Sequence, residues 1–118
     1  MDNNVSFKVK DRILLIELNE ELDHHNAEYI RRKADNIVDG QAIKNIIMDF
    51  KNVSFMDSSG IGVIMGRYKK IVFNKGKIVV INVNKNVDRI LDMSGLYRLV
   101  VKCDNLELAL ELLKERNN

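Results

Sequence analysis

The spacing of apolar residues alternates along the chain between the period of a strand and the period of a helix. Residues 5–9 alternate apolar and polar side chains, and residues 13–18 form a second, mainly apolar run after a charged turn. This arrangement predicts two short strands joined by a tight turn. Nearly unbroken apolar runs at residues 46–50 and 77–83 are typical of strands covered on both faces, and a last short strand is expected at residues 99–101.

Four segments between and after these strands carry apolar residues three and four positions apart, which is the pattern of amphipathic helices. The first begins at Asn26 and ends near Gly40, the second begins near Ser58 and is closed by residues 74–76, the third ends near Gly95, and the fourth is C-terminal. The residues that we expect to face the core from these helices are Ala27, Ile30, Ala34, Ile37 and Val38; Ile61, Ile64, Met65, Tyr68, Ile71 and Val72; Val87, Ile90, Leu91 and Met93; and Leu106, Ala109, Leu110 and Leu113.

Strands that alternate with helices after an opening β-hairpin predict an α/β fold. We expect a single domain over residues 1–118, with a mixed, mostly parallel β-sheet and packed α-helices, because parallel strands need crossover connections. In such sheets, functional residues gather where the carboxyl ends of strands meet the N-termini of helices. Residues 22–25 and 56–59 both arrive at such ends, so we expect them to be neighbours.

The composition is that of a soluble globular chain, with 46% hydrophobic and 31% charged residues in 118. The net charge of +2 comes from 19 basic and 17 acidic residues interspersed along the chain, which argues against DNA or RNA as a direct partner. No apolar stretch approaches the length of a membrane span and residues 1–4 do not open a secretory signal, so we expect a cytoplasmic protein with no membrane partner. Cys103 is the only cysteine, which excludes an intramolecular disulfide and a cysteine-based zinc site.

The polar turn before the second helix is the strongest candidate for a functional site. Asp57, Ser58 and Ser59 can each cap that helix by accepting a hydrogen bond from a free backbone N–H. A helix N-terminus also suits a phosphate, whether on a ligand or attached covalently to a serine. Gly60 and Gly62 remove side-chain bulk from the same turn and allow close approach by another molecule. An ordinary cap with packing glycines explains the same residues, so the local pattern alone leaves the function open.

Catalytic and ligand-binding alternatives find weaker support. Asp23 and a histidine near the serine could suggest a hydrolase, but the G-x-S-x-G pattern is absent because Met56 takes the place of its first glycine. The G-x-G-x-x-x-G spacing misses the dinucleotide fingerprint by one residue, and Gly62 and Gly66 more simply let the helix lie close on the sheet. The adjacent histidines, residues 24–25, point to different sides and lack a third ligand, so no metal or cofactor is expected.

Four segments carry a family pattern, namely residues 21–25 (ELDHH), 54–62 (SFMDSSGIG), 66–69 (GRYK) and 92–96 (DMSGL). Together they resemble the STAS domain of the anti-sigma factor antagonists of sporulating bacteria. The D-S-S-G-[IL]-G core identifies this family most specifically in combination with the other segments, and the resemblance covers essentially the whole chain. It implies a STAS fold and a regulatory switch protein, not an enzyme.

The resemblance also implies how the switch works and which partners it has. The unphosphorylated chain would bind the nucleotide-bound form of an anti-sigma factor with serine kinase activity and so release the sigma factor. Phosphorylation of Ser58 would inactivate the chain, and a dedicated serine phosphatase would restore it. Ser59 is the competing phosphoacceptor on local sequence alone, and only the family motif selects Ser58.

Further residues receive roles from the same resemblance. Asp57 would cap the helix or orient the serine, and Asp23 would take part in the encounter with the kinase, in phosphorylation or in docking. Gly60 and Gly62 would permit close docking, with Ser59 on the same partner surface. Arg67 and Tyr68 are candidates for partner contacts on the helix surface, but we expect a solvated charge at Arg67 and a core aromatic at Tyr68. A stress-response STAS antagonist and a small-molecule-binding STAS module are the alternative functions.

Overall fold

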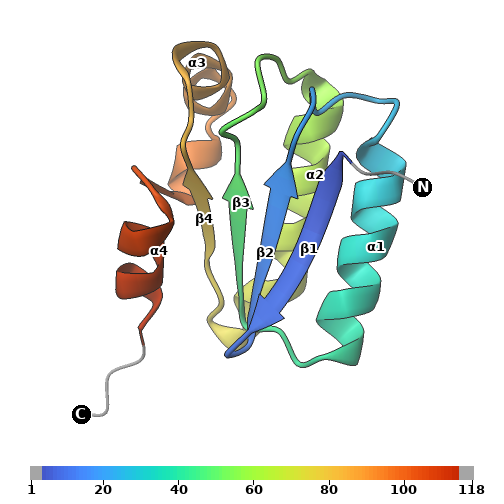
Figure 1. Cartoon of the computed structure of the whole chain (residues 1–118), viewed down its shortest axis with the longest axis vertical. Helices are drawn as coiled ribbons and strands as arrows, with labels where there is room; N and C mark the ends of the chain where they lie inside the picture. Colours follow the sequence, from blue (N-terminus) through green and yellow to red (C-terminus); the bar gives the residue numbers. More distant parts are fainter. Residues whose placement is uncertain (1–3, 115–118) are drawn as a thin grey trace.

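Five strands form one sheet in the order in which they follow one another along the chain (Figure 1). The structure is a computed structural model and describes residues 4–114. β1 (Val5–Lys10) pairs antiparallel with β2 (Ile13–Leu18), and β3 (Asn45–Asp49), β4 (Ile78–Ile81) and β5 (Val101–Cys103) continue the sheet as parallel neighbours. The helices are α1 (Ala27–Gly40), α2 (Ser58–Ile71), α3 (Lys85–Met93) and α4 (Leu106–Leu113), with 3-10 turns η1 (Val72–Asn74) and η2 (Leu96–Arg98). The predicted α/β fold with an opening hairpin is confirmed.

The helices cover the two faces of the sheet unequally. Right-handed crossovers between sequential parallel strands place α1 and α2 on one face, behind the sheet in Figure 1. The larger hydrophobic core joins this face to α1, α2 and α3. A smaller core on the opposite face joins β3 and β4 to α4 through Ala109 and Leu113. Within residues 4–114, no helix is both long and apolar enough to cross a membrane.

The last strand begins later than the sequence predicts. A strand is expected at residues 99–101, but the N–H groups of Leu99 and Val100 both donate to Leu96 O, at 2.8 and 2.9 Å. The chain is therefore still turning at these residues, and it reaches the edge of β4 only at Val101. β2 has its predicted bounds, and β1, β3 and β4 differ from theirs by one or two residues, as the ends of elements commonly do.

Four residues predicted to face the core are exposed. They are Met65 at 38%, Met93 at 80%, Leu106 at 37% and Leu110 at 45%. Met93 is the last residue of α3, which buries Val87 and Leu91 instead. Leu106 and Leu110 lie on one flank of α4, the only helix on its face of the sheet, so no second helix covers them in the described part of the chain. Periodicity indicates which residues share a face, but it does not supply a neighbour for that face.

Arg67 is buried, so the prediction of a solvated side chain is wrong. Its Nε lies 2.8 Å from Asp35 Oδ1 as an ionic contact without a hydrogen bond, and its Nη2 donates to Asp35 Oδ2 at 3.2 Å. Nη1 donates to Val63 O at 3.3 Å. Burial lowers the pKa of Arg67, and the negative charge of Asp35 opposes this shift. The ion pair therefore joins α1 to α2 beneath the surface.

Removing the two partners of this ion pair should have unequal effects, because only 4% of the Arg67 side chain is exposed but 29% of the Asp35 side chain is. We expect Asp35→Ala to cost about 2–3 kcal/mol by leaving a buried cation unpaired, and Arg67→Met to cost about 1 kcal/mol, because Asp35 can be hydrated. Urea unfolding monitored by circular dichroism measures both.

The exposed pair between Lys70 and Asp39 joins the same two helices at 3.0 Å and provides a matched control. Asp39→Ala should cost less than about 0.5 kcal/mol. Equal losses for Asp35→Ala and Arg67→Met would contradict the assigned difference in burial.

Candidate functional site

Two loops at the carboxyl edge of the sheet are held together by a short parallel pairing. Leu22 N donates to Phe55 O and Asp57 N donates to Leu22 O, each at 3.2 Å. Leu22 and Met56 thereby form an isolated parallel bridge, and both side chains are buried. The pairing places the segment after β2 beside the start of α2, as the sequence predicted.

Asp57 is the residue that caps α2. Its backbone is extended (φ −102°, ψ −171°), and its Oδ1 accepts a hydrogen bond from Ser59 N at 2.8 Å. Its carbonyl oxygen accepts from Gly60 N at 2.9 Å. Of the three candidate caps, the structure thus selects Asp57, and Ser58 and Ser59 become the first two residues of the helix.

The two serines differ in accessibility. Ser58 is exposed, and its hydroxyl forms no hydrogen bond with another described residue. Ser59 is half-buried and lines a groove between α1 and α2. Ser58 is therefore the more accessible of the two serines, a difference that the local sequence does not reveal.

Asp23 lies in the turn that leads into α1, where its carboxylate is engaged locally. Its Oδ1 accepts a hydrogen bond from His25 N at 2.9 Å and lies 3.5 Å from His25 Nδ1. Desolvation acts to raise the pKa of Asp23, but the hydrogen bond from His25 N and the nearby imidazole outweigh it, and the pKa is lowered. Asp23 is thus an ionised carboxylate on the same edge as Ser58.

The side chain that reaches across to the cap is His24. Its Nδ1 lies 3.8 Å from Asp57 Oδ2, and the two histidine rings are tilted against each other with centroids 4.1 Å apart. Both histidines are largely exposed. Among residues 4–114, no three His, Cys, Asp or Glu side chains converge as the ligands of a metal would.

The glycines of α2 have different surroundings. A Cβ built on Gly60 would lie 2.3 Å from Met56 Cγ and 3.0 Å from Leu22 Cγ, whereas a Cβ on Gly62 or Gly66 would meet no atom within 4 Å. The prediction that Gly62 and Gly66 let the helix lie close on the sheet is therefore wrong. Gly60 allows the close contact inside the chain, and Gly62 is open to the surface.

A groove of about 330 Å³ runs between α1 and α2 beside this helix start. Its lining includes Glu28 and Arg31 from α1 together with Ser59 and Gly62 from α2. Glu28 and Arg31 are not among the residues singled out from sequence, although both lie within one helical turn of Ala27. Phe55, another residue that the sequence analysis passed over, is 51% exposed in the loop before α2. The exposure of Phe55 close to the exposed Ser58 marks this loop as a candidate contact surface, and only the fold reveals that exposure.

Known proteins similar to this chain share one family. The family model described as the STAS domain matches residues 4–111. An anti-sigma F factor antagonist from Paenibacillus polymyxa is 43% identical over 93 residues, which cover 79% of this chain and 80% of that protein. An anti-sigma-B factor antagonist from Bacillus subtilis is 28% identical over 85% of this chain and 90% of its own.

Solved structures of one similar protein exist in two chemical states. The unphosphorylated anti-sigma factor antagonist SpoIIAA has a TM-score of 0.77 at 28% identity, covering 92% of this chain and 96% of its own. The phosphorylated form of the Bacillus cell fate determinant SpoIIAA has a TM-score of 0.75 at 30% identity, covering 93% of this chain and 99% of its own. The fold described above is thus similar to one that has been observed with and without phosphate.

Alanine at the two glycines of the first turns of α2 should have opposite effects on stability. Gly60→Ala should destabilise the fold by about 1–3 kcal/mol, because the new methyl group meets buried Met56 and Leu22. Gly62→Ala should stabilise it by about 0.5–1 kcal/mol, because alanine favours a helix and has open space here. Urea unfolding tests both, and a neutral Gly60→Ala would contradict the tight contact.

Proposed function

The chain belongs to the STAS domain family of anti-sigma factor antagonists, and from that premise we propose that it is a sporulation-type antagonist switched by phosphorylation of Ser58. Members of this group are regulators, not enzymes, and an antagonist of an anti-sigma factor acts by binding it. The similarity to anti-sigma F factor antagonists supports the sporulation-type assignment. The exposed Ser58 hydroxyl at the start of a firmly capped helix is the observation that carries the proposed switch.

In the proposed cycle, the unphosphorylated chain binds an anti-sigma factor that is also a serine kinase, in its nucleotide-bound form, and the sigma factor is released. The kinase transfers phosphate to Ser58, the complex separates, and a serine phosphatase removes the phosphate. Sigma and anti-sigma factors act on transcription, which takes place in the bacterial cytoplasm, so we place the chain there. No cofactor of its own is required.

Phosphate at Ser58 is compatible with the fold but not with a tight interface. It adds about −1.5 to −2 charges. The N-terminus of α2 favours negative charge there, so the helix has no reason to unwind. The carboxylates of Asp57 and Asp23 lie on the same edge of the sheet, and the added charge makes this surface strongly acidic. A partner surface complementary to a neutral hydroxyl then clashes with the larger phosphate group, must desolvate its charge, and is repelled where it carries acidic side chains of its own.

The remaining site residues divide between orientation and contact. Asp57 holds the helix start by its bond to Ser59 N, which orients Ser58 toward solvent. Gly60 seats the first turn of α2 on Met56, and Gly62 leaves the adjoining surface flat enough for a partner. Asp23 contributes charge to the encounter, in docking or in phosphorylation, and Ser59 borders the groove that a partner side chain could enter.

A stress-response antagonist is the second candidate, because an anti-sigma-B factor antagonist is also similar over most of the chain. The two assignments predict the same switch at Ser58 and differ in which kinase binds. Binding of the purified chain to sporulation-type and stress-type anti-sigma kinases, compared side by side, distinguishes them.

Alanine substitution should separate the two serines as phosphoacceptors. With the cognate anti-sigma kinase and ATP, Ser58→Ala should abolish phosphate incorporation, and Ser59→Ala should retain it, because Ser58 is the more exposed of the two adjacent serines. Mass mapping of the modified residue is the measurement. If phosphate is still incorporated in Ser58→Ala and maps to Ser59, then Ser59 is the phosphoacceptor and the assignment to Ser58 is wrong.

Bulk at Gly62 should weaken partner binding without weakening the fold. We expect Gly62→Val to raise the Kd for the nucleotide-bound kinase by at least about tenfold, because a branched side chain stands on the proposed contact surface. Gly40→Val is the control at the far end of α1, where a Cβ likewise meets no atom within 4 Å. Equal affinity of both variants would place the interface elsewhere.

A further inference from the structure

Charges that are interspersed in the sequence gather at one end of the folded chain. The end opposite Ser58 is built from the β1–β2 turn, the connection from α1 to β3 and the connection from α2 to β4, at the bottom of Figure 1. Lys44 N donates to Arg12 O at 2.8 Å, and Ile46 N donates to Lys77 O at 3.0 Å. A Cβ on Gly76 would lie 2.0 Å from Lys44 O, so these connections are packed backbone to backbone.

This basic end, defined as residues 10–13, 39–45 and 69–77, carries seven Lys and Arg residues and two carboxylates. Its exposed cations are Lys10, Arg12, Lys69, Lys70, Lys75 and Lys77. Of the two carboxylates, Asp39 is already paired with Lys70 at 3.0 Å. The small net charge of +2 therefore conceals an uneven distribution of charge, in which cations gather at this end and Asp23 and Asp57 lie at the opposite end.

Phe73 projects from the middle of this basic end. It lies in η1 and is 89% exposed, more than any other large apolar side chain in the described chain. Lysines precede it at positions 69 and 70 and follow it at positions 75 and 77. An exposed aromatic ring flanked by cations is a combination with which peripheral proteins enter the boundary between lipid headgroups and acyl chains.

Two of the cations occupy backbone conformations that disfavour them. Arg12 (φ 66°) and Lys75 (φ 61°) are left-handed, where glycine or asparagine costs less. With Asp11 and Ala42, they make four of the five non-glycine residues with positive φ in the described chain. The adjacent positive φ angles of Asp11 and Arg12 are those of a two-residue hairpin turn, in which glycine or asparagine is the usual second residue, so the turn itself does not require an arginine there.

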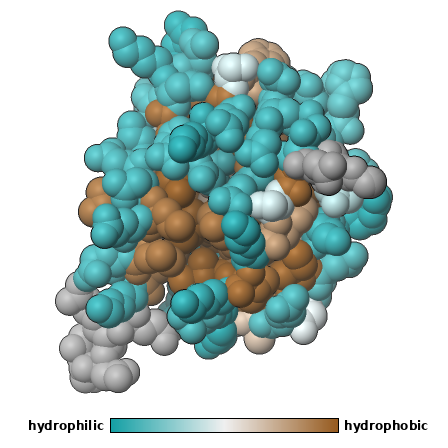
Figure 2. Space-filling model, in the orientation of Figure 1, coloured by the Kyte–Doolittle hydropathy of each residue, from teal (hydrophilic) through white to brown (hydrophobic). Residues whose placement is uncertain are grey.

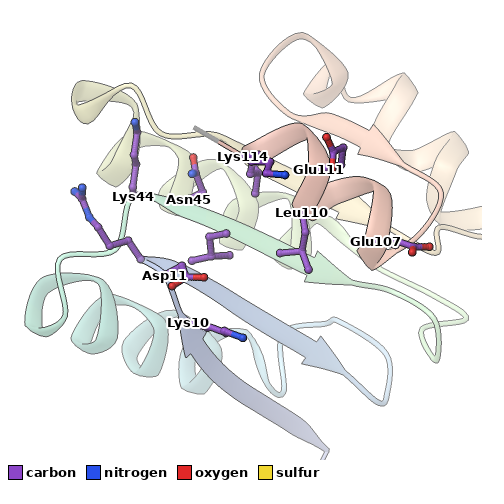
Figure 3. A pocket seen from close by; sticks show the side chains of 11 residues that line it. Lys10, Asp11, Lys44, Asn45, Glu107, Leu110, Glu111 and Lys114 are labelled. Carbon is purple, nitrogen blue, oxygen red and sulfur yellow. The ribbon is translucent and has the colours of Figure 1, made fainter. Parts of the chain in front are cut away.

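An apolar cavity adjoins the same end. It has a volume of about 530 Å³ and lies between the β1–β2 turn and α4, as Figure 3 shows. Ile13, Leu110 and Leu113 contribute its apolar lining. Its charged lining is mixed, with Lys10 and Arg12 on the β1–β2 side and the carboxylates of Asp11, Glu107 and Glu111 beside them. Figure 2 shows the apolar surface of this region bordered by hydrophilic residues. The basic end therefore continues into a surface that can accept apolar groups.

We propose that the basic end docks on an anionic lipid bilayer, with Phe73 entering the headgroup region and the cations facing the lipid phosphates. A double-stranded nucleic acid would use the cations but offers no unpaired base for Phe73 to stack on, and an acidic protein surface would pair with the cations without requiring an exposed phenylalanine. This proposal departs from the expectation of no membrane partner, which rests on the absence of an apolar span and does not bear on a peripheral contact. Docked in this way, the chain presents Ser58 away from the bilayer.

Flotation of the full chain with lipid vesicles tests the proposal. Vesicles of phosphatidylcholine containing about 30% phosphatidylglycerol should bind the chain at about 0.05 M salt, and binding should fall at least about tenfold at about 0.5 M salt. Vesicles of phosphatidylcholine alone should bind little. Failure to bind anionic vesicles at low salt would overturn the proposal.

Variants assign the contact to the basic end. Phe73→Ala should reduce binding about tenfold, whereas Phe55→Ala, the matched change at the other end, should leave it unchanged. Lys75→Asn should reduce binding several-fold while raising Tm by about 1–3 °C, because asparagine tolerates the left-handed backbone. Arg12→Asn should also reduce binding several-fold, but no rise in Tm is expected there because the hydrogen bond from Arg12 Nε to Ala42 O is lost. Lys51→Asn, an exposed lysine outside the basic end, is their control.

The combination of weaker binding with unchanged or higher Tm is a result that damage to the fold cannot produce. Equal losses in the control variants would overturn the assignment to this end. Binding of the chain to a short DNA duplex, measured in parallel, tests the alternative that the basic end is a nucleic-acid site. If the duplex binds as tightly as the vesicles and Phe73→Ala changes neither, the surface is a nucleic-acid site and the lipid proposal is wrong.

Discussion

The pairing of Leu22 with Met56 is the constraint on which the site depends. Neither residue belongs to a regular strand, yet the backbone of Leu22 bonds to Phe55 and Asp57 on either side of Met56, and the side chains of Leu22 and Met56 are wholly buried. Because Gly60 lies against both side chains, the first turn of α2 has one position relative to the segment after β2. The Asp57 cap then fixes which hydroxyl stands outside. A flexible loop could also expose a serine, but it would not present the same surface to a partner each time.

The fold separates two kinds of surface at opposite ends of the parallel strands. Carboxyl ends of strands and N-termini of helices lie together at the Ser58 end, where helix dipoles and acidic side chains meet. Turns that begin strands lie together at the other end, where cations and Phe73 gather. The longest dimension of the molecule is 40 Å, and the two ends lie apart along it. A phosphate at one end therefore alters a local surface and leaves the other end available for a second contact.

Much of this architecture can be predicted from local sequence. The features that cannot be predicted depend on contacts between residues that are far apart in the sequence. Two periodicities predict the order of strands and helices, and the polar turn before α2 predicts a helix start. Arg67 appears solvated in sequence because the carboxylate that accompanies it, Asp35, lies 32 positions away. Gly60 and Gly62 are equivalent in the sequence and differ only in what lies opposite each. Leu110 has the spacing of a core residue but receives no covering helix in the described chain.

The central claim is that phosphorylation acts on the surface at Ser58 and not on the backbone that holds it. Amide chemical shifts of the labelled chain, recorded before and after stoichiometric phosphorylation, test this most directly. The account predicts changes confined to residues 22–26 and 54–63, with the buried strands β3 and β4 unmoved. Changes that spread through β3, β4 and α3 would contradict it and would make the switch a conformational one.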